Sequence, residues 1–143
     1  MITKKAGTVL LNVKTKKVAL VYRKDGKGLE FPKGHLEEGE SLVSCAVRET
    51  EEETRRKNHI IDDKELDILK YVTAKGENVE LYMYMAIDDG KIDRDISDED
   101  KEDWNWFGVD EVENQLEYQN WKEFWKKIRN RVEKILGGSD GKY

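Results

Sequence analysis

The chain has 143 residues, of which 37% are hydrophobic and 40% are charged, and its formal net charge is −5. This length suits one domain with its own core. The net negative charge argues against a stable nucleic-acid partner. It still permits a nucleotide substrate, because bound metal ions would supply local positive charge. The single cysteine excludes an internal disulfide framework. The sequence contains neither a run of ~20 apolar residues nor a signal-peptide segment. We therefore expect a cytoplasmic protein with no membrane partner.

Two segments rich in β-forming residues open the chain, at residues 6–13 (AGTVLLNV) and 17–23 (KVALVYR), and the polar turn between them predicts a β-hairpin. Residues 24–40 follow as a predicted loop that holds four of the eleven glycines and the only proline. A loop of this length in a compact domain is usually functional. Ser41 is a suitable N-cap for a helix that we expect to run to about residue 57.

Three strands and a long helix are predicted in the second half of the chain. Residues 66–73 and 79–87 predict two strands, and the second, VELYMYMAI, is apolar enough for a central strand buried on both faces. Residues 104–109, WNWFGV, predict a short strand. Over residues 118–136 large apolar side chains recur at helical spacing, so one face of this helix should pack on the sheet. These side chains are Trp121, Phe124, Trp125, Ile128, Val132 and Ile135.

The order of these elements predicts an α+β fold in which helices and a sheet form layers. We expect one domain over residues 1–136, because neither a repeat nor a linker interrupts the chain. The ending at residues 137–143, GGSDGKY, predicts a flexible C-terminal tail.

The first predicted helix carries an unusual concentration of carboxylates. At about 100° per residue, Glu49, Glu52 and Glu53 share one face of this helix. Like charges at such spacing cost roughly 0.2–0.5 kcal/mol per pair. Hard divalent ions such as Mg²⁺ bind through a few carboxylates together with water and substrate phosphates, and an ion here would offset the repulsion. For this pattern alone, a solvated acidic helix face is the alternative interpretation.

The residues around these carboxylates make the pattern specific. Six anchors of the Nudix box, G-x5-E-x7-R-E-U-x-E-E-x-G-U with U a bulky aliphatic residue, stand at the required spacing: Gly34, Glu40, Arg48, Glu49, Glu52 and Glu53. The chain therefore resembles the Nudix (MutT-like) hydrolases over nearly its whole length. This resemblance implies an α/β/α sandwich with a mixed β-sheet between the helices.

The match to the box has three departures. Thr50 and Arg56 occupy positions of bulky aliphatic residues, and Arg55 replaces the second glycine, which would serve as a helix C-cap. We therefore expect the helix to continue through RRKN, where cations suit the C-terminal dipole. Asn58 would then take the left-handed turn.

The resemblance implies roles for the box residues. Glu49, Glu52 and Glu53 would bind Mg²⁺ or Mn²⁺, and one of them would help to deprotonate the attacking water. Arg48 would orient these glutamates, so the catalytic candidates are Arg48, Glu49 and Glu52; an ordinary salt bridge is the alternative for Arg48.

Two further box residues would have supporting roles under the same resemblance. Glu40 would hold Arg48 as structural support, or act simply as a helix-dipole partner. Gly34 would offer its carbonyl to a metal ion, with a plain turn as the alternative.

Residues on either side of the box extend the resemblance to the dinucleoside polyphosphate hydrolase branch. The sequence PKGH enters the box as in that branch, so Lys33 would contact a phosphate and His35 would bind a phosphate or act as an acid. For His35 alone, a role in loop structure is the alternative. Glu99, within ISDED, resembles an additional metal-binding glutamate of that branch, with a solvated acidic loop as the alternative.

The implied activity is metal-dependent cleavage of a nucleoside diphosphate linked to another group, with a dinucleoside polyphosphate such as diadenosine tetraphosphate as the leading substrate. Cleavage of nucleoside triphosphates, ADP-ribose or nucleotide sugars is the enzymatic alternative. A non-catalytic nucleotide sensor is the other alternative, but such modules typically lose box glutamates that this chain retains. Either a monomer or a homodimer is compatible with the sequence. Candidates for base stacking are Tyr82, Tyr84, Trp104, Trp106 and Tyr118.

Overall fold

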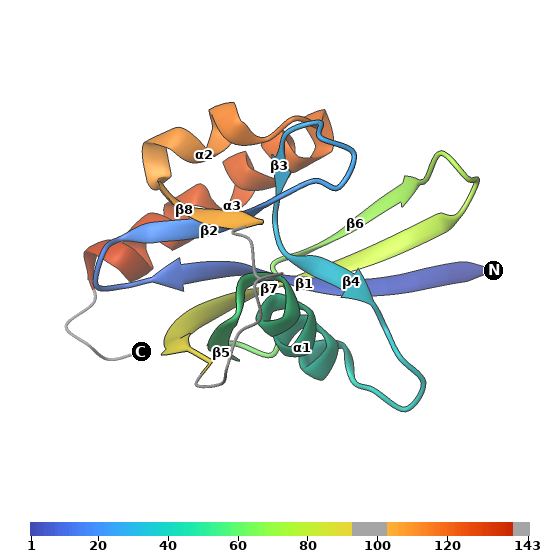
Figure 1. Ribbon diagram of the computed structural model, residues 1–143, viewed down its shortest axis with the longest axis horizontal. Helices are drawn as coiled ribbons and strands as arrows, with labels where there is room; N and C mark the ends of the chain where they lie inside the picture. The colour runs from blue at the N-terminus through green and yellow to red at the C-terminus, as the bar shows by residue number, and fades with distance from the viewer. Residues whose placement is uncertain (93–102, 139–143) are drawn as a thin grey trace.

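A mixed β-sheet lies between helical layers in the computed structural model, which describes residues 1–92 and 103–138 (Figure 1). The helices are α1 (Leu42–Thr54), α2 (Val109–Gln115) and α3 (Gln119–Gly137). Helix α1 packs on one face of the sheet, and α2 and α3 lie over the other face. The predicted α+β fold with α/β/α layers is confirmed.

The sheet is built around two long strands, β1 and β7, which run parallel to each other. Strand β7 pairs with β5 and β6, β1 pairs with β2 and β4, and β2 also pairs with β3 and β8, all antiparallel. The predicted hairpin of β1 and β2 is confirmed by the pair Leu11 and Val18. The strands are β1 (Ile2–Asn12), β2 (Lys17–Tyr22), β3 (Leu29–Glu30), β4 (Lys33–His35), β5 (Arg56–Ile60), β6 (Asp67–Val72), β7 (Asn78–Lys91) and β8 (Trp104–Gly108).

Alternate residues of β1 face the two helical layers, as the period of a strand requires. Ala6 belongs to a buried cluster with residues of α1, and the hydroxyls of Thr8 and Thr50 lie 2.7 Å apart in a buried hydrogen bond. Val9 and Leu11 belong instead to the main core under α3. The even-numbered residues of β1 therefore face α1, and the odd-numbered residues face α3.

The main core depends on aromatic packing between α3 and the segment after β3. The predicted apolar stripe of α3 is confirmed: its residues are buried except Ile135, which is partly buried. Phe31 is fully buried among them, with its ring centroid 5.1 Å from Trp121 and 5.6 Å from Phe124 in edge-to-face geometry. This anchor fixes the chain immediately before β4.

The prediction of an uninterrupted loop over residues 24–40 was wrong, because this segment contains β3 and β4. Glu30 pairs with Val21 of β2, and Gly34 pairs with Ala6 of β1. Both strands are only two or three residues long, and the glycines and the proline around them hide any alternation in the sequence. Their pairing is decided by long-range contacts with β1 and β2.

The predicted end of the first helix was also wrong. Helix α1 ends at Thr54, and Arg55 adopts the left-handed conformation at φ 60°, so Asn58 does not take that role. The left-handed conformation costs a residue with a Cβ about 1–2 kcal/mol of conformational free energy. Strand β5 begins immediately afterwards, where Arg56 forms a bidentate pair with Asp88 of β7 at 2.6 and 2.7 Å. Pairing with β7 therefore overrides the helix-favouring charges.

Helix α2 was not predicted; it follows β8, where the N–H of Gly108 donates to Glu111 Oε1 at 2.8 Å. The predicted tail lies largely outside the described residues, since the description ends at residue 138. In the described part of the chain, no helix is both long and apolar enough to cross a bilayer.

Candidate active site

The Arg48 guanidinium is the centre of the box residues. It contacts Glu40 with two hydrogen bonds of 2.7 and 3.0 Å, and it also donates to Glu49 at 3.1 Å and to Glu52 at 3.2 Å. A further N–H donates to the carbonyl of His35 at 3.0 Å. Arg48 holds the pKa of Glu40 at about 2, and the Glu40 carboxylate in turn raises the pKa of Arg48. The cation therefore ties α1 to the end of β4 and to the loop between them.

The three glutamates on the common face of α1 differ in their exposure to solvent. The side chain of Glu52 is 57% exposed, whereas that of Glu49 is 15% exposed. Glu53 is partly buried, and its carboxylate accepts the backbone N–H of Lys33 at 2.8 Å. Burial raises the pKa of Glu53 to about 7. Burial and the neighbouring carboxyl of Glu52 also raise the pKa of Glu49.

Close approach of β4 to α1 depends on Gly34. A Cβ added to Gly34 would lie 1.5 Å from Glu49 Oε2, so the carboxylate occupies the space that a side chain would need. The Gly34 carbonyl lies 3.7 Å from the buried sulfur of Cys45, and burial raises the pKa of that thiol to about 11. The carbonyl and the glutamates are thus brought to one side of β4, and Cys45 is kept as an unreactive thiol.

The donor set fits a hard divalent ion. Among the residues that the structure describes, no three acidic, histidine or cysteine side chains converge tightly enough to hold an ion as they stand, because Arg48 contacts Glu49 and Glu52 while Glu53 turns toward Lys33. The partly buried Glu53 carboxyl nevertheless has its charged form disfavoured by burial, and a nearby cation would restore that charge. Oxygen ligands of this kind suit Mg²⁺ or Mn²⁺.

The flanking site residues lie near β4. Lys33 Nζ is 3.3 Å from Glu30, which also accepts a hydrogen bond from Arg23 at 2.8 Å. His35 is 63% exposed, with Nε2 3.8 Å from a carboxylate oxygen of Glu77. Glu99 lies outside the described residues.

Glu30 was missed by the sequence analysis. It is buried between two cations, although no motif around it in the sequence marks such a position. The only available signal was an acidic residue directly before the apolar Phe31.

The candidate stacking residues are spread over different parts of the molecule. Tyr84 is buried beside α1, and Tyr118 lies under the Arg23 guanidinium at 4.4 Å from the ring centroid. Trp104 and Trp106 contact each other edge-to-face at 5.1 Å and cover a small cluster around Leu10 on the α1 face. The structure therefore does not bring these aromatic residues into one stacking surface.

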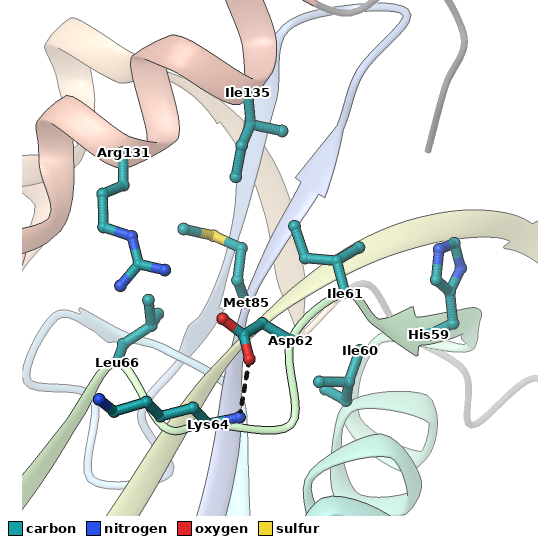
Figure 2. A pocket seen from close by; sticks show the side chains of 9 residues that line it. All are labelled: His59, Ile60, Ile61, Asp62, Lys64, Leu66, Met85, Arg131 and Ile135. Atoms are coloured by element: carbon teal, nitrogen blue, oxygen red, sulfur yellow. Dashed lines mark hydrogen bonds between the residues drawn. The ribbon is translucent and has the colours of Figure 1, made fainter.

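A separate hollow of about 520 Å³ lies between the segment after β5 and the C-terminal half of α3. Figure 2 shows Arg131 and Ile135 from α3 facing Asp62 and Leu66, and the Asp62 carboxylate accepts the backbone N–H of Lys64 at 3.0 Å. None of the box residues lines this hollow. It is distinct from the glutamate cluster.

A family model, the NUDIX domain, matches residues 1–127. The chain therefore belongs to the Nudix family. Together with the box glutamates on α1, this match makes it a Nudix hydrolase, and the resemblance predicted from the sequence is confirmed.

Several known proteins are similar to this chain. Subunit 2 of the mRNA decapping complex of Schizosaccharomyces pombe is 34% identical over an alignment of 89 residues that covers 57% of this chain and 11% of that protein. The chain thus spans a small part of this curated relative. An Ap4A hydrolase of C. elegans is 23% identical with a TM-score of 0.72, covering 92% of this chain and 99% of that one. A NUDIX hydrolase of Nitrosomonas europaea is 21% identical with a TM-score of 0.68, covering 92% and 91%.

Replacing Gly34 by Ala should displace the Glu49 carboxylate, since the new Cβ would overlap it. We expect Mn²⁺ affinity, measured by isothermal titration calorimetry, to fall by about 10-fold or more, the equivalent of one lost charged contact. Gly137→Ala is the matched control, because a Cβ there meets nothing within 4 Å. Equal Mn²⁺ affinity in both variants would contradict this role of Gly34.

Replacing Glu53 by Gln should alter the pH dependence of stability. The pKa of Glu53 is raised from 4.5 to about 7 in the folded state, so in chelator the wild-type free energy of unfolding should fall as pH rises through this window. Above pH 7 the variant should be more stable by about 1–2 kcal/mol, a value reduced from the full shift by solvent screening.

Urea unfolding at several pH values measures this difference, with Glu51→Gln on the same helix as the control. Adding Mn²⁺ should reverse the order, because only the wild type keeps the full set of charged ligands. If the stability of Glu53→Gln depended on pH as that of the wild type does, the pKa of Glu53 would not be raised by folding, and the prediction would be contradicted.

Proposed function

We propose that the enzyme hydrolyses a phosphoanhydride bond in a nucleoside diphosphate linked to another group, with a dinucleoside polyphosphate such as diadenosine tetraphosphate as the preferred substrate. The observation that carries the proposal is the Arg48-centred cluster, in which one cation aligns Glu49 and Glu52 beside the partly buried Glu53. A solvated acidic helix face would not place a carboxylate against the backbone of β4, as Glu53 is placed.

Glu49, Glu52 and Glu53, with the carbonyl of Gly34, are the residues that would hold Mg²⁺ or Mn²⁺. When bound, such an ion supplies Lewis acidity that polarises a phosphoryl oxygen and makes bound water more acidic. Glu99 is proposed as a further ligand; it lies outside the described residues.

Other steps of the reaction would be carried out by residues of the protein itself. Glu52 is the most exposed glutamate of the cluster and would accept a proton from the attacking water. Arg48 orients Glu49 and Glu52 by its hydrogen bonds. Lys33, adjoining Glu53 through its backbone N–H, would bind a phosphate with its ammonium group.

The preference for a dinucleoside polyphosphate rests on the PKGH sequence, through Lys33 and His35, and is supported by the shared fold of the C. elegans Ap4A hydrolase. His35 is exposed at the end of β4 and would contact a phosphate there. The identity with a decapping subunit makes capped RNA the second candidate. Its product chemistry is of the same class, although the net charge of −5 does not favour a long anionic partner.

We expect Mg²⁺-dependent cleavage of diadenosine tetraphosphate in preference to the other members of a substrate panel. The panel contains capped RNA, ordinary and oxidised nucleoside triphosphates, ADP-ribose and a nucleotide sugar, and products are separated by chromatography with and without chelator. A preference for another member of the panel would support the proposed phosphoanhydride hydrolysis but contradict diadenosine tetraphosphate as the preferred substrate. Tight nucleotide binding without cleavage would instead identify a sensing module.

Glu52→Gln and Glu53→Gln should each lower turnover by about 10²–10⁴-fold, the range for a lost acid–base group, with the fold retained by circular dichroism. Glu51→Gln removes the same charge from the same helix and should leave turnover within about 3-fold, since a change outside the site should cost less than 1 kcal/mol. Near-normal turnover in both site variants would contradict the assignment of these glutamates to a metal site.

A further inference from the structure

Lys5 of β1 is a partly buried cation that has no charge partner within residues 1–92 and 103–138. Among the residues that the structure describes, its side chain makes no hydrogen bond or ion pair, although it is only partly exposed. Burial and the positive charge of Lys33 lower the pKa of Lys5. A partly buried charge without a partner is unfavourable, so this position is suited to an anion from outside the protein.

The strand register places Lys5 beside Lys33 and His35. Lys5 pairs with His35, and Gly7 pairs with Lys33, in the antiparallel ladder of β1 and β4. Directly paired residues point to the same face, so Lys5, Lys33 and His35 share the face opposite α1. Lys5 and Lys33 are diagonal neighbours, for which the spacing is about 7–8 Å.

The acidic residues near Lys5 are already engaged. Glu30 contacts both Arg23 and Lys33, each within 3.3 Å. Glu77 accepts a hydrogen bond from the Thr3 hydroxyl at 3.1 Å and lies near His35. Both carboxylates attract Lys5 only at longer range. The described part of the chain therefore offsets the charge of Lys5 only in part.

Lys5 is partly exposed and lies in the N-terminal half of β1. Figure 1 shows that the N-terminal end of β1, together with β6, extends beyond α2 and α3. Lys5 aligns with Leu81 of β7 and Leu69 of β6, which are both buried, and Tyr71 follows Leu69 on the same face. Burial raises the pKa of Tyr71 to about 12, which keeps its hydroxyl neutral as a hydrogen-bond donor. On this face Lys5 therefore lies between Lys33, its diagonal neighbour on β4, and the buried leucines that align with it on β7 and β6.

We propose that Lys5 is a further substrate-binding residue, which contacts a phosphate remote from the cleaved bond and, with Lys33, favours long polyphosphate chains. This inference rests on the proposed function. Lys33 adjoins Glu53 through its backbone N–H, while its side chain shares a face with Lys5. A polyphosphate that extends from the glutamate cluster around β4 onto this face would meet Lys33 first and Lys5 next. A short chain would reach only the first lysine.

Binding of inorganic tripolyphosphate and pyrophosphate, measured by calorimetry in chelator, tests this proposal without requiring any nucleotide to be cleaved. Lys5→Met keeps the length of the side chain and removes its charge. We expect tripolyphosphate affinity to fall by about 10-fold, as for the loss of one charge-assisted contact, while pyrophosphate affinity changes by less than about 3-fold. Lys5→Arg should restore most of the tripolyphosphate affinity.

Lys4→Met is the matched control, because Lys4 is exposed on the opposite face, with Nζ 5.8 Å from the ring centroid of Tyr82. It should leave both affinities within about 2-fold, as for a screened surface charge. Equal losses of tripolyphosphate affinity in the Lys4 and Lys5 variants would show that the change in net charge alone causes the effect, and would overturn the proposal. Absence of tripolyphosphate binding in the wild type would overturn it as well.

Kinetics separate this proposal from the proposed function. If diadenosine tetraphosphate is cleaved, Lys5→Met should raise its KM with little change in kcat, because Lys5 is remote from the reacting bond. If the enzyme prefers a substrate with a shorter phosphate chain, the leading function fails, while the loss of tripolyphosphate affinity in Lys5→Met still supports the anion site. A fall in kcat alone would contradict a binding role for Lys5.

Discussion

The site depends on the hydrogen bonds of one guanidinium, that of Arg48. Its planar group matches the carboxylate of Glu40 in a bidentate contact and still reaches Glu49 and the carbonyl of His35. A lysine ammonium cannot present donors in this fixed arrangement. Because the surrounding carboxylates repel one another, this cation stabilises their close arrangement between α1 and β4. Its hydrogen bonds therefore position Glu40 and Glu49.

Two glycines allow the main chain to pass close enough for these contacts. At Gly34 the space of a side chain is filled by the Glu49 carboxylate, and at Gly7 a Cβ would lie 2.2 Å from the carbonyl of Pro32. The second contact lets the segment before β4 lie close against β1, and Phe31 fixes that segment in the core under α3. Core packing on one face of the sheet thus sets the position of the site residues on β4.

The sequence was sufficient for the parts of the molecule that depend on local periodicity and fixed spacing. The apolar stripe of α3, the strand β7 and the box spacing around Arg48 are of this kind. It was insufficient where partners are distant in the chain: Arg55 ends α1 because β5 pairs with β7, and β4 forms because Gly34 can approach β1 and α1. Lys5 likewise gains significance only through its register with His35.

Strand β4 lies between two groups of charged side chains. Its neighbouring residues point to opposite faces, so Gly34 meets the glutamates of α1 while the side chains of Lys33 and His35 point away from them. Each group includes its own ion pairs, because Arg48 contacts Glu49 and Glu52 on the α1 face and Lys33 contacts Glu30 on the opposite face. Under the proposed function, the carboxylates on the first face would hold a metal ion, and Lys33 and Lys5 on the second would contact phosphates. The backbone N–H of Lys33, bonded to Glu53, joins the two halves of the site.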